Sequence, residues 1–209
     1  MPLPLKIILG VIVSYLLGSI PTAYLFGRLR GLDIRQYGSG NVGATNAFRV
    51  LGKGLGTVVL LVDILKGVVA TTMVADIFGL GDIGYRVVLG LVVVVGHNWT
   101  VFLQFKGGKG IATSLGVLIG LTIKIAAFRP MLLISLLVWA AVFLLTGFVS
   151  LASIVAATIL PFLAVMTDQP FAVITLGIIF CVFVVIRHRL NIKRLLSGKE
   201  HRVRFSSQK

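Results

Sequence analysis

The chain has few acidic side chains and a single cysteine, and both shortages remove classes of chemistry. Only six of its 209 residues are Asp or Glu, against 20 Lys and Arg. The acids form no carboxylate cluster that would hold Mg²⁺, so we expect neither a metal ion nor any other cofactor. The lone thiol, Cys181, forms no internal disulfide and belongs to no cysteine cluster suited to a metal. We therefore expect Cys181 to be a small apolar residue within a helix.

Apolar residues dominate instead. Hydrophobic residues make up 57% of the chain and charged residues 12%, and the mean hydropathy is +1.06. This composition is not that of a soluble domain, and seven apolar runs have the length of roughly 17–25 residues that crosses a bilayer core. We expect an all-α polytopic membrane helix bundle of about seven transmembrane helices in one domain, 1–209, with five spans as the alternative. The first run lacks a cleavage site and is expected to be retained. The expected spans are 5–26, 55–75, 86–104, 111–127, 131–147, 151–167 and 170–187.

The net charge of +14 would suggest a nucleic-acid partner in a soluble protein, but its distribution argues against one. With seven spans and alternating loops, fifteen of the twenty Lys and Arg residues fall on one side. The positive-inside rule puts that side in the cytoplasm, with the amino terminus outside and the carboxyl terminus inside. The basic tail is expected to attract anionic membrane lipids. The fifteen are Arg28, Arg30, Arg35, Arg49, Lys53, Lys106, Lys109, Arg187, Arg189, Lys193, Arg194, Lys199, Arg202, Arg204 and Lys209.

A glycine-rich stretch at 38–46 is the first of three polar segments beside the apolar runs. It formally matches the dinucleotide fingerprint G-x-G-x-x-G, but an apolar helix and a basic linker precede it where that fold needs a strand. Small residues leave backbone N–H groups open to an anion, and a following helix would add its own. Arg49 would share a helical face with Asn46. The alternative is a plain re-entrant turn.

The second stretch, 105–113, resembles half of a phosphate-binding P-loop. Lys109 is followed by Gly110 and not by Ser or Thr, so nucleotide hydrolysis is disfavoured. Two lysines and three glycines at the mouth of a membrane helix still favour an anion site, and Lys109 is the better placed lysine. Lys106 could instead anchor the helix at the membrane interface. His97 could instead be a structural residue that forms hydrogen bonds.

The third stretch, 187–194, leaves the last span on the same side. His188 and Asn191 are three residues apart, so a continuing helix would aim both toward the bundle. Arg187 and Arg189 could instead be ordinary cytoplasmic charges that set the orientation of the last span. Glu200, an acid among tail cations, either serves a site or pairs with one of them.

Two ionisable residues fall within the second span. Asp63 and Lys66 are three apart and can pair on one helical face. Placing a charge at membrane depth costs free energy, so such residues indicate a function. Pairing of the two charges offers a structural explanation, and both explanations remain open. Ser150 and Ser153 open the sixth span, with helix packing as their alternative role.

Together the segments 39–46, 96–110 and 187–202 resemble the three motifs of the bacterial acyl-phosphate:glycerol-3-phosphate acyltransferases, in order and spacing, and the similarity runs over about residues 10 to 204. The resemblance implies a seven-helix inner-membrane enzyme with its site open to the cytoplasm. It would move a fatty acyl group from acyl phosphate to the 1-hydroxyl of sn-glycerol 3-phosphate, giving lysophosphatidic acid and phosphate in the first acylation of phospholipid synthesis. The family lacks the His-x4-Asp motif of other glycerophosphate acyltransferases, and none of the three histidines here has an acid five residues on.

The resemblance also implies roles for single residues, without assigning an oligomeric state. The phosphoryl group of acyl phosphate would be cradled by Ser39, Asn41, Gly43, Thr45 and Asn46. The positions that hold glycerol 3-phosphate, and that form the expected catalytic set, match Arg49, Lys109, Ser153, His188 and Asn191. The rest of the expected substrate-binding set is Gly40, His97, Lys106, Gly107, Gly108, Gly110 and Glu200.

A small transporter or channel for an anionic phosphorylated solute is the rival interpretation. It would use similar glycines and cations along a path between helices. The special residues gather on one side of the expected topology and not at the bilayer midplane, which favours the enzyme.

Overall fold

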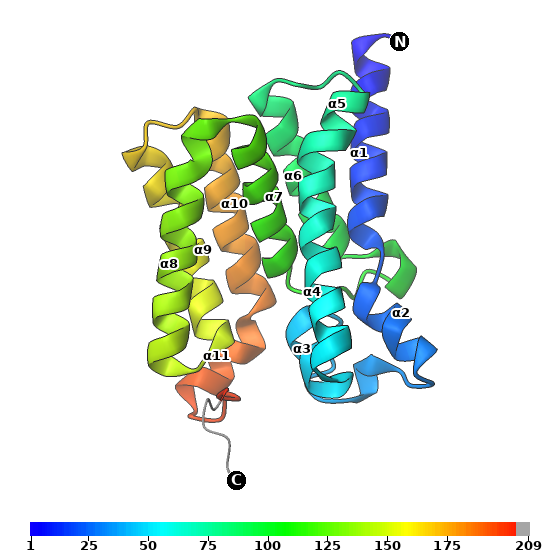
Figure 1. Cartoon of the computed structure of the whole chain (residues 1–209), viewed down its shortest axis with the longest axis vertical. Helices are drawn as coiled ribbons and strands as arrows, with labels where there is room; N and C mark the ends of the chain where they lie inside the picture. Colours follow the sequence, from blue (N-terminus) through cyan, green and yellow to red (C-terminus); the bar gives the residue numbers. More distant parts are fainter. Residues whose placement is uncertain (204–209) are drawn as a thin grey trace. The chain divides into compact units, whose positions relative to one another are not determined.

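The structure is a computed structural model in which residues 1–203 are described (Figure 1). Within that range every regular element is a helix, as the apolar runs predicted. The chain forms two compact units, the first covering Met1–Ala126 and the second beginning at Ala127. The single domain expected for 1–209 stays a prediction. Two of the cations expected on the cytoplasmic side, Arg204 and Lys209, lie outside the described residues.

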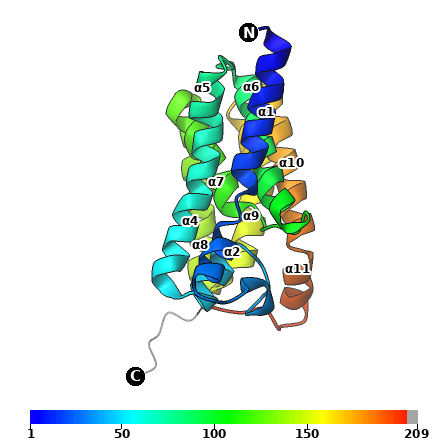
Figure 2. The same cartoon turned by 90° about the vertical axis from the view of Figure 1, so that its right-hand side faces the viewer.

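The first unit is built on two packed helix pairs. Helix α1 packs along α6, and α4 packs along α7, as both views show (Figures 1 and 2). A π-helical turn, Ala70–Val74, joins α4 to α5, and 3-10 turns occur at Ile34–Gln36 and Val101–Leu103. The helices are α1 Leu3–Ser19, α2 Thr22–Leu29, α3 Ala44–Val50, α4 Gly52–Val69, α5 Ala75–Ile77, α6 Ile83–Asn98 and α7 Ile111–Lys124.

The second unit is an antiparallel set of three long helices with a short one at its end. Helix α9 packs against both α8 and α10, and α11 follows α10 (Figure 1). Pro130 falls in the first turn of α8, where its missing N–H has no intrahelical partner to lose. The helices are α8 Arg129–Thr146, α9 Val149–Met166, α10 Phe171–Arg187 and α11 Arg189–Leu196.

Each of the seven predicted apolar runs lies mainly on a helix, but the helices differ in length. Four helical stretches are long and apolar enough to cross a membrane: Gly52–Ile77, Ile83–Leu103, Ala126–Thr146 and Val149–Met166. Two bent pairs, α1 with α2 and α10 with α11, raise the number to six if each pair is one span. Helix α7 is apolar but ends at Lys124, so it is shorter than the predicted 111–127. The number of seven spans stays a prediction.

The structure bends at two places along the predicted runs. The span predicted over 5–26 breaks after Ser19, and α2 is bent by 41° from α1. Pro21 has no N–H for the helical ladder and disfavours helical geometry at Ile20, so the break falls there. At His188 the chain bends by 62° between α10 and α11, so the continuing helix considered for His188 and Asn191 is not straight.

Glycines let the helices of the first unit approach backbone to backbone. A Cβ atom added to Gly116 on α7 would lie 1.9 Å from the carbonyl oxygen of Ile64 on α4. One added to Gly96 on α6 would lie 2.3 Å from the carbonyl oxygen of Tyr15 on α1. Membrane helices associate through such small-residue contacts because lipid provides no hydrophobic force between them. Helix packing through glycine is therefore present in this unit.

Candidate functional site

The loop 38–46 is held in shape by the side chain of Asn46. Its Oδ1 accepts a hydrogen bond from the backbone N–H of Ser39 at 2.9 Å, and its Nδ2 donates to the carbonyl oxygen of Tyr37 at 3.1 Å. Asn46 is only 1% exposed. The buried amide of Asn46 thus holds the loop backbone in place, while Ser39 stays exposed on the loop.

The glycines of this loop are needed for its backbone course. Gly38 and Gly40 have φ angles of 60° and 70°, in the left-handed region that glycine adopts readily. A Cβ on Gly38 would lie 2.3 Å from Oδ1 of Asn46 and 3.3 Å from Cδ of Arg49. The exposed Arg49 side chain therefore passes directly over the loop, and Oδ1 of Asn41 receives the N–H of Gly43 at 3.0 Å.

An ion pair before the loop was not predicted from the sequence. The Arg35 guanidinium donates to both carboxylate oxygens of Asp33, at 2.9 and 2.6 Å, and lies 4.9 Å from the ring centre of Tyr24. The hydrogen bond from the Arg35 side chain lowers the pKa of Asp33 to about 2. The i, i+2 spacing of the two charges was the only sequence signal, and it is weak outside a turn.

The second glycine loop lies on the carboxyl-terminal end of α6. The N–H of Gly107 donates to the carbonyl oxygen of Asn98 at 3.1 Å, and that of Gly108 to the carbonyl oxygen of His97 at 3.0 Å. Both glycines are buried. Gly110, with φ of 79°, is the N-cap of α7, so the half-buried Lys109 stands at the amino-terminal end of that helix. The first amide groups of a helix lack intrahelical acceptors and favour anions.

The side chain of Lys106 is exposed, unlike that of Lys109, which agrees with either of the roles considered for it. Asn98 is a residue that sequence reasoning passed over. It is fully buried, and Oδ1 and Nδ2 of its side chain have no hydrogen-bond partner. A Cβ on Gly110 would lie 2.7 Å from that Oδ1, so Asn98 lies directly beneath the cap of α7. No spacing rule would have found this position.

One hydrophobic cluster joins the two glycine-rich loops within the first unit. Leu103, between α6 and the second loop, packs in the same buried cluster as Val42 and Ala47 of the first motif. Val59 on α4 belongs to the same cluster. Segments about 60 residues apart in the sequence are thereby held by a common core.

The third motif surrounds the carboxylate of Glu200 in the second unit. Oε1 of Glu200 accepts hydrogen bonds from Nδ2 of Asn191 at 2.6 Å and from the Ser150 hydroxyl at 2.8 Å. Oε2 accepts from Nε of Arg194 at 2.8 Å. Glu200 therefore pairs with a tail cation, one of the two alternatives left open. Burial alone would raise the pKa of Glu200, but these three hydrogen bonds outweigh it and lower the pKa below its ordinary value.

His188 lies buried at the bend between α10 and α11. Its Nδ1 donates to the carbonyl oxygen of Val184 at 2.8 Å. Because a carbonyl oxygen only accepts, Nδ1 carries a hydrogen, and the bond fixes which way the ring is turned.

Ser153 on α9 is also buried and oriented by neighbours. Its hydroxyl donates to the carbonyl oxygen of Val149 at 2.8 Å and accepts from Nε1 of Trp139 at 3.2 Å. Trp139 on α8 is a contact that sequence reasoning missed, because nothing in the spacing of the two residues indicates it. The back-bond from Ser153 to its own helix is common for serine in helices.

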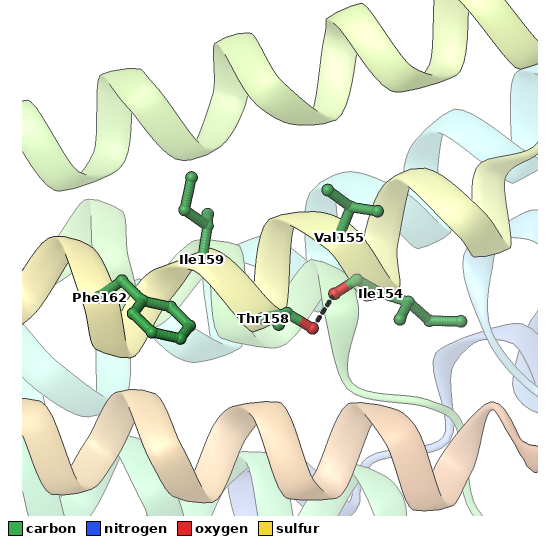
Figure 3. A pocket seen from close by; sticks show the side chains of 5 residues that line it. All are labelled: Ile154, Val155, Thr158, Ile159 and Phe162. Atoms are coloured by element: carbon green, nitrogen blue, oxygen red, sulfur yellow. Dashed lines mark hydrogen bonds between the residues drawn. The ribbon is translucent and has the colours of Figure 1, made fainter.

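A shallow groove runs along α9, lined by Ile154, Val155, Thr158, Ile159 and Phe162 (Figure 3). The Thr158 hydroxyl donates to the carbonyl oxygen of Ile154 at 2.9 Å, so the groove presents almost only apolar atoms. It has no group suited to phosphate. Over residues 1–203 no three His, Cys, Asp or Glu side chains gather as metal ligands would.

Each unit thus assembles part of the predicted site. In the first, the loop of Ser39 and Asn46 meets Arg49, and the loop of Lys109 joins it through a shared core. In the second, Asn191 and Glu200 are hydrogen-bonded beside the start of α9. Asp63 and Lys66, predicted as a possible pair, do pair, with Nζ of Lys66 at 2.7 Å from Oδ1 of Asp63. The substrate-contacting roles of these residues stay predictions.

Known proteins resemble the chain over nearly its whole length. A family model for glycerol-3-phosphate acyltransferase matches residues 8–198. Glycerol-3-phosphate acyltransferase 2 of Moorella thermoacetica is 45% identical over 198 residues, covering 94% of this chain and 97% of the relative. The glycerol-3-phosphate acyltransferase of Aquifex aeolicus is 44% identical, covering 95% of this chain and 100% of the relative.

Solved structures agree in fold as well. A crystal structure of PlsY, described as an integral membrane glycerol 3-phosphate acyltransferase in its glycerol 3-phosphate form, superposes with a TM-score of 0.86. It shares 40% identity and covers 95% of this chain and 96% of its own. The lysophosphatidic acid form of the same enzyme gives a TM-score of 0.83. This chain is an integral membrane enzyme, and it belongs to the glycerol-3-phosphate acyltransferase family.

Proposed function

We propose that this enzyme transfers a fatty acyl group from acyl phosphate to the 1-hydroxyl of sn-glycerol 3-phosphate, releasing lysophosphatidic acid and inorganic phosphate. The observation that carries the proposal is the pairing of two glycine-rich loops by the Leu103 cluster, with Arg49 over one and Lys109 in the other. Two dianionic substrates need cations and amide donors in such an arrangement. Solved relatives are described with glycerol 3-phosphate and with lysophosphatidic acid, which supports the acceptor and the product.

The first loop is assigned to the phosphoryl group of the donor. Its exposed Ser39 and Thr45 offer hydroxyl groups, and the positive φ angles of Gly38 and Gly40 turn the backbone sharply. Arg49 adds a guanidinium that can bind phosphate oxygens in a fork. Asn46 and Asn41 hold the loop in shape and need not touch the substrate themselves.

The second loop is assigned to neutralising charge on glycerol 3-phosphate. Lys109 stands where the first turn of α7 presents backbone amides, and the two favour the same anion. Ser153, His188 and Asn191 are assigned to the same substrate by their match to the family's positions. Their orientation is fixed by Trp139, Val184 and Glu200, respectively.

The main task of the protein in this reaction is to place the two substrates correctly. An acyl phosphate is a mixed anhydride, so the carbonyl is already activated and phosphate leaves readily. The acceptor hydroxyl oxygen bonds to the acyl carbon as the bond from that carbon to the phosphate oxygen breaks. The hydroxyl proton passes to a phosphate oxygen of a substrate or to His188. Fixed positive charge and aligned reactants then supply the rate enhancement.

The proposed location is the bacterial inner membrane, crossed seven times, with the site facing the cytoplasm. The support is the charge distribution, because fifteen of twenty cations lie on one side of that topology. Both glycine loops of the first unit follow helices, α2 and α6, that run toward the same end of that unit (Figures 1 and 2). Membrane lipids surround the apolar helices in this arrangement.

The test uses the purified full chain in detergent or in liposomes, given acyl phosphate and glycerol 3-phosphate. The expected result is lysophosphatidic acid and inorganic phosphate in equal amounts, with no product when acyl-CoA or acyl carrier protein replaces acyl phosphate. Solute flux across liposomes without acyl transfer would instead support a transporter. Product formed from acyl-CoA alone would contradict the proposed donor.

A further inference from the structure

A buried charge pair lies under the second glycine loop and has no part in the chemistry proposed above. The side chains of Asp63 and Lys66 on α4 are 1% and 3% exposed. Nζ of Lys66 donates to Oδ1 of Asp63 at 2.7 Å and to the carbonyl oxygen of Ile20 at 2.5 Å. Ile20 lies in the break between α1 and α2, and its carbonyl oxygen, which also accepts the N–H of Thr22, favours a cation there.

The pair is poorly built for stability alone. Every short contact of the carboxylate goes to Oδ1, which also accepts from the Thr22 hydroxyl at 3.2 Å. Oδ2 is buried and has no hydrogen-bond partner. Leaving a buried carboxylate oxygen unsatisfied is costly, and well-packed apolar residues often replace a buried ion pair without loss of stability. Retaining an acid here therefore calls for another explanation.

The side chain of His97, on the neighbouring helix α6, provides that explanation. Nδ1 of His97, on the last turn of α6, is 3.8 Å from Oδ1 of Asp63. The negative carboxylate favours the ring form with a hydrogen on Nδ1, and it attracts the ring more strongly if the ring is protonated. The opposite ring nitrogen, Nε2, points at the loop, because a Cβ on Gly108 would lie 2.1 Å from it. The imidazole thus fills the space between the carboxylate and the loop backbone.

The loop is attached to the same turn of α6 by its backbone. Gly108 donates to the carbonyl oxygen of His97, and a Cβ on Gly107 would lie 2.1 Å from that oxygen. The positions of His97 and of the two glycines are therefore linked by direct contact. The carboxylate also contacts Thr22 at the start of α2, so it ties α2, α4 and α6 together.

We infer that Asp63, neutralised by Lys66, is a positioning residue that holds His97 beneath Gly107 and Gly108 and so sets the place of Lys109 in the site. The catalytic part of this inference rests on the proposed function, but the structural part does not. In this inference His97 acts on the substrate through the loop, in place of the direct contact expected from the sequence.

Hydrogen exchange tests the structural part without any substrate. In the full-length protein, Asp63→Asn should speed deuterium uptake in the segment 105–113 relative to the unmodified chain. The matched control is Asp76→Asn, which breaks the ion pairs of Asp76 with Arg86 and Lys124 in the same unit. That change should leave uptake in 105–113 as it was. Unchanged uptake in Asp63→Asn would overturn the inference whether or not the chain transfers acyl groups.

Kinetics then test whether the position of the loop matters to turnover. Asp63→Asn and His97→Asn should each lower kcat/KM for glycerol 3-phosphate by about 10²-fold, the usual effect of slight misplacement. The double variant should lose no more than His97→Asn alone, because one residue acts through the other. Losses that multiply in the double variant would overturn the coupling. An inactive unmodified chain would count against the proposed function, and the exchange result would still decide the structural part.

A neutral replacement separates positioning from simple stabilisation. The pair Asp63→Leu with Lys66→Met should melt at or above the temperature of the unmodified chain, since no buried charge remains. Its turnover should nonetheless fall as far as that of Asp63→Asn. A stable double variant with normal turnover would show that the pair is only structural. If this variant does not fold, the isosteric Asp63→Asn decides the question alone.

Discussion

The side-chain amide of Asn191 donates a 2.6 Å hydrogen bond to the carboxylate of Glu200, nine residues further along the chain. The same carboxylate receives Ser150 from α9 and Arg194 from α11. Glu200 thus connects the end of the third motif to the helix that carries Ser153. Removing its charge should affect both the stability of the second unit and the orientation of Asn191.

The variant Glu200→Gln should lower the free energy of unfolding by about 1–3 kcal/mol, because three donors lose a charged acceptor. The loss should depend on pH. Because the hydrogen bonds lower the pKa of Glu200 in the folded protein, the ionised carboxylate stabilises it above the ordinary value of 4.5. That stabilisation is lost as the pH falls through the lowered pKa.

Melting temperatures of the full chain in detergent check this directly. The difference between the unmodified chain and Glu200→Gln should be present at a pH of about 7 and should shrink at a pH of about 4 or below. Lys199→Gln, which changes an exposed neighbouring charge, should melt like the unmodified protein at both values. A difference that grows in acid would contradict the assigned direction.

Lys109→Ala should lower turnover strongly while leaving the protein folded in the membrane. The loss of a fixed cation beside the phosphate should cost about 10²–10³-fold in kcat. Phosphate release from acyl phosphate in the presence of glycerol 3-phosphate measures it. Lys53→Ala, which removes an exposed cation at the start of α4, is the control and should keep normal turnover. Near-normal activity in Lys109→Ala would refute its role.

Gly108→Ala should disrupt the second loop, because the new methyl group would lie 2.1 Å from Nε2 of His97. The ring and the loop must separate, at a cost of about 1–3 kcal/mol in stability. Substrate binding should weaken as well, raising KM for glycerol 3-phosphate. Gly54→Ala is the control, since nothing lies within 4 Å of its added carbon and alanine favours helix there. Equal melting temperatures and equal KM values in the two variants would contradict this contact.

Gly116→Ala should separate α4 from α7. Its methyl group would meet the carbonyl oxygen of Ile64 at 1.9 Å, and two helix backbones yield less readily than a side chain. We expect a loss of about 1–3 kcal/mol or more, seen as a lower melting temperature and poorer recovery of folded protein. Gly84→Ala on α6, with open space around the added carbon, should behave like the unmodified chain. A fully stable Gly116→Ala variant would rule out the close approach.

Much of the fold could be predicted from the sequence because apolar length is a direct signal of a membrane helix. The helices α4, α6, α8, α9 and α10 lie close to the predicted runs. The break at Pro21 was missed because apolar residues continue through it, and a hydropathy pattern records composition and not direction. The bend at His188 was missed because polar residues at helical spacing fit either a straight or a bent helix.

The site was predictable in its residue types and less so in their roles. Glycines and cations in three segments indicated phosphate chemistry, and Asp63 with Lys66 indicated a pair. The sequence did not show that Asn46 and Glu200 form hydrogen bonds that hold neighbouring groups in place. Those bonds depend on which backbone and side-chain groups the fold brings within reach. Trp139, Asn98 and the carbonyl of Ile20 were missed for the same reason.

The contact of Gly116 with α4 has a mechanical consequence. Two helices that touch through their peptide groups cannot slide or tilt separately, since no flexible side chain separates them to absorb the strain. The loop that precedes α7 is therefore attached to a helix that is held firmly against α4. We therefore expect movement during turnover in the connecting segments before α3 and α7, and not between α4 and α7.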